Sequence, residues 1–107
     1  MAKRRYAVRW ATPALRDLLE IADYIRSDNA RAATRFARQV KTKVSRLAAF
    51  PQSGRPVPEF PGSGLRELLI GDYLVIYRVV STQRRVEILT LRHGARRLRE
   101  AEVSVVE

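Results

Sequence analysis

The stretch that decides the fold is Tyr73-Leu74-Val75-Ile76-Tyr77-Arg78-Val79-Val80, whose β-branched and aromatic residues predict a strand. Successive side chains of a strand point to opposite faces of its sheet. One face therefore carries Tyr73, Val75, Tyr77 and Val79, and the other carries Leu74, Ile76, Arg78 and Val80. Because Arg78 is the one charged residue of the stretch, both faces are apolar and both need a cover.

The neighbouring segments extend this strand into a sheet. Leu65–Ile70 and residues 85–92 have the same strand-like composition, and turn residues at Gly71-Asp72 and Ser81-Thr82-Gln83-Arg84 separate them from the central stretch. Such runs joined by short turns predict a three-stranded antiparallel meander. The alternation over residues 6–10 predicts one further strand near the N-terminus.

Two helices are predicted between the first strand and the meander. Thr12 offers an N-cap oxygen and Pro13 suits the first helical position. Asp28 or Asn29 is predicted to cap a second helix, which ends before Phe50-Pro51. The short connection makes the two helices an antiparallel hairpin. The sequence therefore predicts an α/β (α+β) fold in which this hairpin packs on an antiparallel sheet.

The length and composition indicate one small domain. The chain has 107 residues, 46% of them hydrophobic, which is enough to enclose a core and too apolar for disorder. We expect a single domain over residues 1–107, with a tail at 98–107 that is free to move. Four prolines and three glycines over residues 51–64 exclude a helix or a central strand there and predict a loop.

The charge of the chain is dominated by arginine. There are 21 Lys and Arg against 11 Asp and Glu, a formal net charge of +10, and 18 of the 21 cations are arginine. Arginine is suited to bidentate recognition of phosphates and carboxylates, so we expect an acidic partner, either nucleic acid or an acidic protein segment. The stripe Arg31, Arg35, Arg38 and Lys41 on the second predicted helix indicates a solvated face.

The sequence lacks the signals of several other classes. Because it has no cysteine, it can form neither a disulfide framework nor a Cys-based zinc site. No spacing of His and carboxylates suggests a metal site, and no glycine loop suggests a phosphate site, so we expect no cofactor. No apolar run reaches the roughly 20 residues of a membrane span, and the first residues lack the apolar stretch of a secretion signal. We therefore expect a cytoplasmic protein.

The second apolar face of the central strand suggests an interaction surface. If a protein partner covers it, the contact residues are Leu74, Ile76, Arg78 and Val80. The alternative is that the loop or the C-terminal tail of the chain folds over this face.

A basic cluster directly follows the last predicted strand, where side chains leave the sheet and can reach outward. Its residues Arg92, His93, Arg96 and Arg97 are candidate contacts to a target. His93 is the single histidine of the chain and could transfer protons, or it could be a hydrogen-bonded structural residue. Arg66 is either a buried, paired arginine or a second candidate catalytic residue.

The order of these segments resembles the RelE/ParE superfamily of bacterial toxins from type II toxin–antitoxin modules. The resemblance spans about residues 6–97, and it rests on the strand, the helix hairpin and four motifs after them. These motifs are Phe50-Pro51-Gln52-Ser53-Gly54-Arg55, Leu65-Arg66-Glu67-Leu68, Tyr73-Leu74-Val75-Ile76-Tyr77-Arg78-Val79, and Val86-Glu87-Ile88-Leu89-Thr90-Leu91-Arg92-His93-Gly94-Ala95-Arg96. The resemblance implies a compact α/β toxin whose partner is an antitoxin with an acidic, partly disordered segment.

Two activities occur in the superfamily that the chain resembles. RelE-like members cleave mRNA on the ribosome with basic residues and often a C-terminal tyrosine, whereas ParE-like members poison DNA gyrase. No tyrosine follows Tyr77 here, and the loop, Arg66 and His93 motifs look more like the ParE branch. The resemblance therefore implies gyrase poisoning without intrinsic catalysis. The alternatives are a RelE-type endoribonuclease, with Arg66 and His93 as candidate catalytic residues, and a basic nucleic-acid-binding module.

Overall fold

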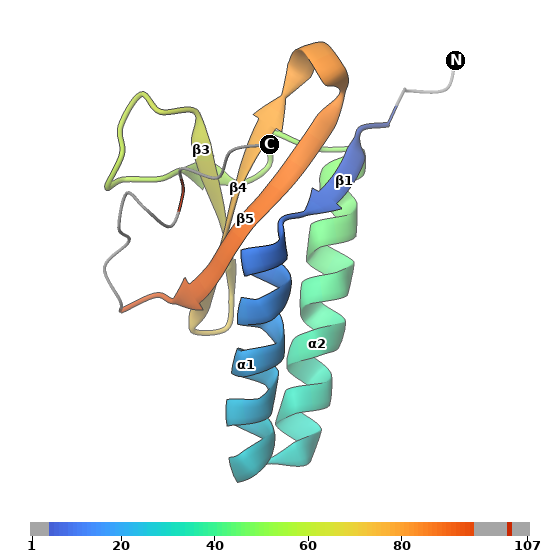
Figure 1. Ribbon diagram of the computed structural model, residues 1–107, viewed down its shortest axis with the longest axis vertical. Coiled ribbons are helices and arrows are strands. Elements are labelled where there is room, and N and C mark those ends of the chain that lie inside the picture. Colours follow the sequence, from blue (N-terminus) through green and yellow to red (C-terminus); the bar gives the residue numbers. More distant parts are fainter. Residues whose placement is uncertain (1–4, 96–102, 104–107) are drawn as a thin grey trace.

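The computed structural model describes residues 5–95 and residue 103. It contains a helix hairpin packed on one face of a five-stranded sheet. Figure 1 shows the helices side by side, with the sheet crossing them and a long loop on its far side. This architecture confirms the predicted α+β fold. Within the described residues, no helix is both long and apolar enough to cross a membrane.

The helices are α1, Thr12–Asp28, and α2, Ala30–Ser45, and the short helix η1, Arg46–Ala48, follows α2. Asn29 caps α2 as predicted, because its side chain accepts a hydrogen bond from the Ala32 N–H. The prediction that Thr12 caps α1 is wrong, since Ala11 holds that position without a side-chain hydrogen bond. The Ala11 N–H donates to the Ile88 carbonyl of β5. Ala11 is therefore still paired with the sheet, and the helix begins at the next residue, Thr12.

The strands are β1, Ala7–Trp10; β2, Arg55–Pro56; β3, Leu65–Ile70; β4, Tyr73–Val80; and β5, Arg85–His93, with the short helix η2, Ser81–Gln83, between the last two. Their order in the sheet is β1-β5-β4-β3-β2. The antiparallel meander β3-β4-β5 is confirmed. Strand β1 pairs with β5 in parallel, so the sheet is mixed and not purely antiparallel. Strand β2 lies within the predicted loop, and its proline sits on a sheet edge, where a missing N–H is tolerated.

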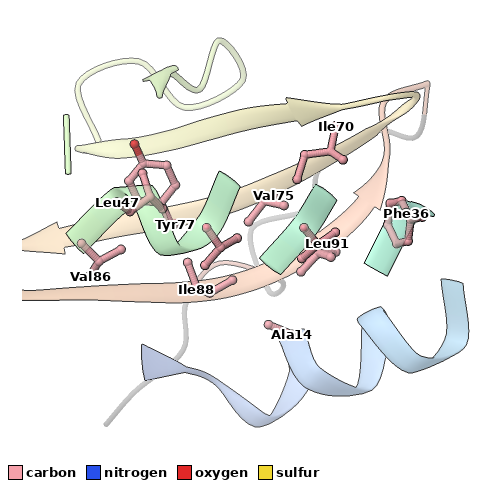
Figure 2. Close-up of a cluster of buried hydrophobic side chains, with 11 residues drawn as sticks. Ala14, Phe36, Leu47, Ile70, Val75, Tyr77, Val86, Ile88 and Leu91 are labelled. Carbon is pink, nitrogen blue, oxygen red and sulfur yellow. The ribbon is translucent and has the colours of Figure 1, made fainter. Parts of the chain in front are cut away.

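The first face of the sheet forms the main core with the helix hairpin. Tyr77, Val75 and Ile88 are completely buried there against Phe36 of α2 and Ala14 of α1. Figure 2 shows these side chains gathered between the strands and the helices. Residues of β4 alternate as the sequence predicted, because Tyr73, Val75, Tyr77 and Val79 all contact this core.

The second face of the sheet is covered by the chain itself. Ile76 is 1% exposed and Leu74 is 9% exposed. They cluster with Val57 from the loop, and Phe60 and Val103 pack against the same cluster. The expectation that Leu74 and Ile76 are open to a partner is therefore wrong. The loop and Val103 supply the apolar cover that a partner was expected to provide, which is the alternative that the sequence left open.

The hydroxyl of Tyr77 anchors the start of this loop. It accepts a hydrogen bond from the Gly54 N–H at 2.8 Å and donates one to the Pro51 carbonyl at 2.9 Å. Gly54 approaches so closely that a Cβ there would lie 2.5 Å from the hydroxyl and 2.8 Å from the Glu67 carbonyl. Burial raises the pKa of Tyr77, and the Gly54 N–H and the Arg66 charge offset this only in part, so the hydroxyl remains a donor. Within the motif Phe50-Pro51-Gln52-Ser53-Gly54-Arg55, Pro51 and Gly54 therefore attach the loop to Tyr77.

Strand β5 contains a β-bulge, and the residues that follow the bulge form hydrogen bonds with α1. Ile76 pairs with Thr90 while Tyr77 pairs with Ile88, which leaves Leu89 as an extra residue in β5. Beyond the bulge, Asp17 of α1 accepts hydrogen bonds from the Thr90 hydroxyl at 2.6 Å and from the Leu91 N–H at 3.1 Å. Strand β1 ends opposite Ile88, so Asp17 supplies an acceptor on the side of β5 that β1 no longer covers.

Replacing Tyr77 by Phe tests the loop anchor. The variant Tyr77→Phe leaves the buried Gly54 N–H without its acceptor, so we expect the free energy of unfolding to fall by about 1–3 kcal/mol. Urea denaturation measures this change. The control Tyr73→Phe lies on the same face of β4, and its hydroxyl makes no hydrogen bond among the described residues. Equal losses in the two variants would contradict the anchoring role.

Candidate functional site

The sequence-predicted residue His93 lies at the edge of a small cavity between α1 and the end of β5. The cavity has a volume of about 210 Å³. It is lined by Asp17, Glu20, Ile21, Tyr24, Tyr73, Leu91, Arg92 and His93. We refer to it as the His93 pocket.

The His93 ring is held by two contacts. Its edge meets the Tyr73 ring, with the centroids 5.3 Å apart and the ring planes at 78°. Its Nδ1 accepts a hydrogen bond from the Ala95 N–H at 3.1 Å. In a neutral imidazole, an acceptor at Nδ1 places the proton on Nε2. The Tyr73 ring in turn packs on Phe36 at 5.2 Å, which connects the pocket to the core.

The described lining of the His93 pocket is rich in polar side chains. Two carboxylates, Asp17 and Glu20, and two phenols, Tyr24 and Tyr73, line it. Burial raises the pKa of Tyr73, and neighbouring Tyr24 and Asp72 raise it further. The described lining thus places two carboxylates and one arginine, Arg92, around the single histidine of a strongly basic chain.

Arg92 does not serve as the outward-facing target contact that the sequence predicted. Its side chain is 2% exposed, and it interacts with other groups of the protein. The cause is its register: Arg92 pairs with Leu74 across β4 and β5, so its side chain lies on the covered second face. His93 pairs with Tyr73 and lies on the opposite face. Arg96 and Arg97 lie outside the described residues.

Arg66 is a paired arginine, as one of the two sequence interpretations held. Its Nη1 donates to the Gly54 carbonyl at 2.6 Å and to the Gln52 carbonyl at 3.2 Å. An ion pair between Arg55 and the buried Glu67, at 2.6 Å, connects the same loop to β3. Arg66 therefore helps to position the loop over the sheet.

The structure does not bring Arg66 and His93 together. Arg66 pairs with Tyr77 on one side of β4, and His93 pairs with Tyr73 on the other. Four residues of extended strand separate these partners by about 13 Å, at about 3.3 Å per residue. The two candidate catalytic residues therefore belong to different places on the sheet.

Arg78, predicted to contact a partner, holds a buried carboxylate within the sheet. Its Nε lies 2.7 Å from Glu87, and Arg85 approaches the same carboxylate at 2.7 Å. Burial alone would raise the pKa of Glu87, but the hydrogen bonds and charges of both arginines outweigh it and lower the pKa below its usual value. Val80, beside this cluster, is half-buried.

The sequence analysis did not identify the roles of Asp17 and Glu87. Asp17 connects α1 to β5 by hydrogen bonds, and Glu87 is the buried carboxylate that two arginines hold. The signal for Asp17 was present, because it lies three residues after Ala14 and four before Ile21 on the apolar side of α1. The signal for Glu87 was its place between Val86 and Ile88 in a strand whose other residues are mostly apolar. A carboxylate in such a position requires a partner.

Comparison with known proteins finds related toxins. Residues 8–98 match the family model described as the ParE toxin of the type II toxin–antitoxin system parDE. The chain is 41% identical over 96 residues to the candidate toxin Y4kP of Sinorhizobium fredii. The aligned region covers 88% of this chain and 92% of Y4kP. The chain is 38% identical over 88 residues to Toxin RelE2 of Caulobacter vibrioides, with 81% and 93% covered.

Solved structures share the fold. A chain of the chromosomal ParDE toxin–antitoxin system from P. aeruginosa superposes with a TM-score of 0.70 at 23% identity, covering 85% of this chain and 98% of that one. A chain of the toxin–antitoxin complex RelBE2 from Mycobacterium tuberculosis gives a TM-score of 0.55 at 28% identity, with 83% and 98% covered. The helix hairpin and the mixed sheet are therefore an architecture found in both kinds of system.

The arginine-held carboxylate generates a pH-dependent prediction. Because the folded-state pKa of Glu87 is lowered, its contribution to stability is present above the unfolded pKa of about 4.3 and is lost as the pH falls through the folded value. We expect Glu87→Gln to lower the free energy of unfolding by about 1–3 kcal/mol at pH 7. The difference from wild type should shrink below about pH 4, where protonated Glu87 resembles Gln.

Urea denaturation at a series of pH values checks this expectation. The control Glu20→Gln removes an exposed carboxylate of α1 and should change stability by less than about 0.5 kcal/mol. A Glu87→Gln loss that is the same at pH 3 and pH 7 would contradict the role of the charge.

Proposed function

Since this chain belongs to the ParE toxin family of type II toxin–antitoxin systems, we propose that it stops growth by poisoning DNA gyrase and is neutralised by a cognate antitoxin. The family confirms the resemblance seen in the sequence. In this proposal the toxin binds gyrase in the cytoplasm and holds a state in which the DNA is cleaved. Gyrase performs the covalent chemistry, so the toxin needs no catalytic residue of its own.

The observation that carries the proposal is the pair of carboxylates that lines the His93 pocket. A ribonuclease must activate a ribose hydroxyl, protonate the leaving oxygen and stabilise a phosphate that gains negative charge. His93 is the one histidine available, and the carboxylates of Asp17 and Glu20 line its pocket. These charges repel a phosphate, and the described cation of the lining, Arg92, has its side chain on the other face of the sheet.

The second candidate function is ribosome-dependent cleavage of mRNA. Two relatives support keeping it as the alternative, because one is named Toxin RelE2 and another belongs to a RelBE2 complex. This activity would have to assemble its catalytic groups around either Arg66 or His93. The Nη1 of Arg66 already donates to two loop carbonyls, and two carboxylates line the described part of the His93 pocket.

A gyrase cleavage assay tests the proposal. The purified toxin, freed of antitoxin, should trap linear plasmid DNA in the presence of gyrase and ATP, and it should leave mRNA intact on programmed ribosomes. Because His93 has no catalytic role in this account, His93→Ala should reduce trapping by less than about tenfold. Codon-specific mRNA cuts that His93→Ala abolishes, with no linear plasmid, would assign the ribonuclease instead.

Arg96 and Arg97 remain predicted contacts to the target. If they bind gyrase or its DNA, changing both to Ala should reduce growth inhibition on induced expression by at least about tenfold, because charged contacts to a partner are lost. The urea midpoint of the purified double variant should stay within error of wild type. Full toxicity in this variant would remove both residues from the mechanism.

A further inference from the structure

Helix α2 carries a row of arginines on its outer face. Arg31, Arg35 and Arg38 follow one another at intervals of four and three residues, so they are neighbours on the helix surface. All three side chains are exposed. The opposite face of α2 packs into the core through Phe36 and Val40. We call the three arginines, which face away from the core, the arginine row.

The arginine row lines a hollow with a volume of about 360 Å³. The other residues of its described lining are Ala30 and Thr34. This lining therefore presents three positive charges and a hydroxyl, and it contains no large apolar side chain. In Figure 1 the end of the hairpin at which α2 begins extends beyond the sheet, so a large partner can reach the first half of α2.

The arginine row breaks two rules of helix stability. Like charges three or four residues apart repel one another on a helix. Arg31 also lies in the first turn of α2, where the helix dipole disfavours a cation and no acidic residue compensates it. None of the three arginines forms an ion pair with another described residue. Positions that break local rules without a structural gain are expected at functional sites, and an anionic partner would offset both costs.

The chemistry of the hollow favours a nucleic acid over an acidic protein segment. Protein interfaces bury aromatic or aliphatic anchors at their centre, and this hollow has no such anchor in its described lining. A phosphate backbone requires only cations and hydrogen-bond donors, and arginine can donate to two phosphate oxygens at once. The row therefore matches the chemistry of a phosphate backbone.

The spacing of the arginine row agrees with duplex DNA. Arg38 follows Arg31 by seven residues, which is about 10 Å of helix at about 1.5 Å per residue. Duplex DNA carries one phosphate charge per roughly 1.7 Å of its axis. The phosphates are thus more closely spaced than the arginines, so all three arginines can contact phosphates at the same time.

We propose that the arginine row binds the phosphate backbone of duplex DNA, and that this DNA is the segment that gyrase holds in its cleaved state. The second half of the inference rests on the proposed gyrase poisoning. Because the contacts are to phosphates, binding does not depend on the base sequence. The DNA contacts add to those with gyrase, so the toxin binds the complex of gyrase and DNA more tightly than it binds gyrase alone.

The salt dependence of DNA binding tests the first half of the inference. The purified toxin is titrated with a short labelled DNA duplex at several salt concentrations. The logarithm of the association constant falls with the logarithm of the salt concentration, and each phosphate contact contributes about 0.9 to the slope. Changing Arg31, Arg35 and Arg38 together to Gln should therefore lower the magnitude of the slope by about two to three. Circular dichroism melts confirm that this row variant is folded.

The matched control is the triple variant Arg9→Gln, Arg16→Gln and Arg84→Gln. These arginines are exposed, lie outside α2 and form no ion pair with another described residue. The control therefore removes the same net charge from other parts of the surface, and its slope should fall by less than about one. Equal slopes in the two triple variants would overturn the proposal, because DNA binding would then depend on net charge alone.

Trapping of cleaved plasmid tests the second half of the inference. With gyrase and ATP present, the row variant should need at least about tenfold more toxin than wild type to give the same amount of linear plasmid, because its DNA contacts are lost. The control variant should need less than about twofold more. A row variant that binds duplex DNA weakly but traps plasmid as well as wild type would overturn this half.

The outcomes also separate this inference from the proposed function. If the wild-type toxin traps no cleaved plasmid, gyrase poisoning fails together with the second half of the inference, while the salt slopes still decide whether the row binds DNA. If the row variant keeps the wild-type slope but loses affinity for the antitoxin encoded beside the toxin gene, the row belongs to an acidic protein partner and the proposal is overturned.

Discussion

Strand β4 must be covered on both faces, and the rest of the structure follows from this constraint. Val75 and Tyr77 on one face need the helix hairpin, and Ile76 on the other needs the loop. The Tyr77 hydroxyl joins the two covers, because its ring lies in the helix-side core while its oxygen bonds to Gly54 and Pro51 at the start of the loop. One side chain thus couples the packing of both layers.

Local sequence patterns predicted the helices and strands. The features that could not be predicted depend on contacts between residues that are distant in sequence. The bounds of β3 and β4 follow from alternation and turn residues, which are local. The cover of Ile76 could not be predicted, since an apolar strand face does not reveal whether a partner or a distant segment such as Val57 packs on it. Arg92 was misplaced for the same reason: its burial depends on cross-strand register. The carboxylates that line the His93 pocket come from α1, far away in sequence, so the surroundings of His93 could not be predicted either.

The surface of the molecule divides its charges in a way that suits a binding toxin. Two carboxylates of α1 line the His93 pocket, while the five cations of α2 have no carboxylate beside them in that helix. The gyrase poisoning that we propose requires complementary surfaces and no acid–base pair. The separation of Arg66 from His93 along β4 agrees with this proposal, because a general acid and a general base for RNA cleavage would have to lie close together.

Hydrogen exchange of the isolated protein tests most directly the claim that the chain covers both faces of its own sheet. The informative amides are Gly54, which donates to Tyr77, and Val57, which donates to the Leu65 carbonyl. The account predicts that both exchange at least about a hundredfold more slowly than in an unfolded chain, as amides of a packed cover do. Exchange of both at unfolded-chain rates, with β4 still protected, would show that the second face stands open and would contradict the account.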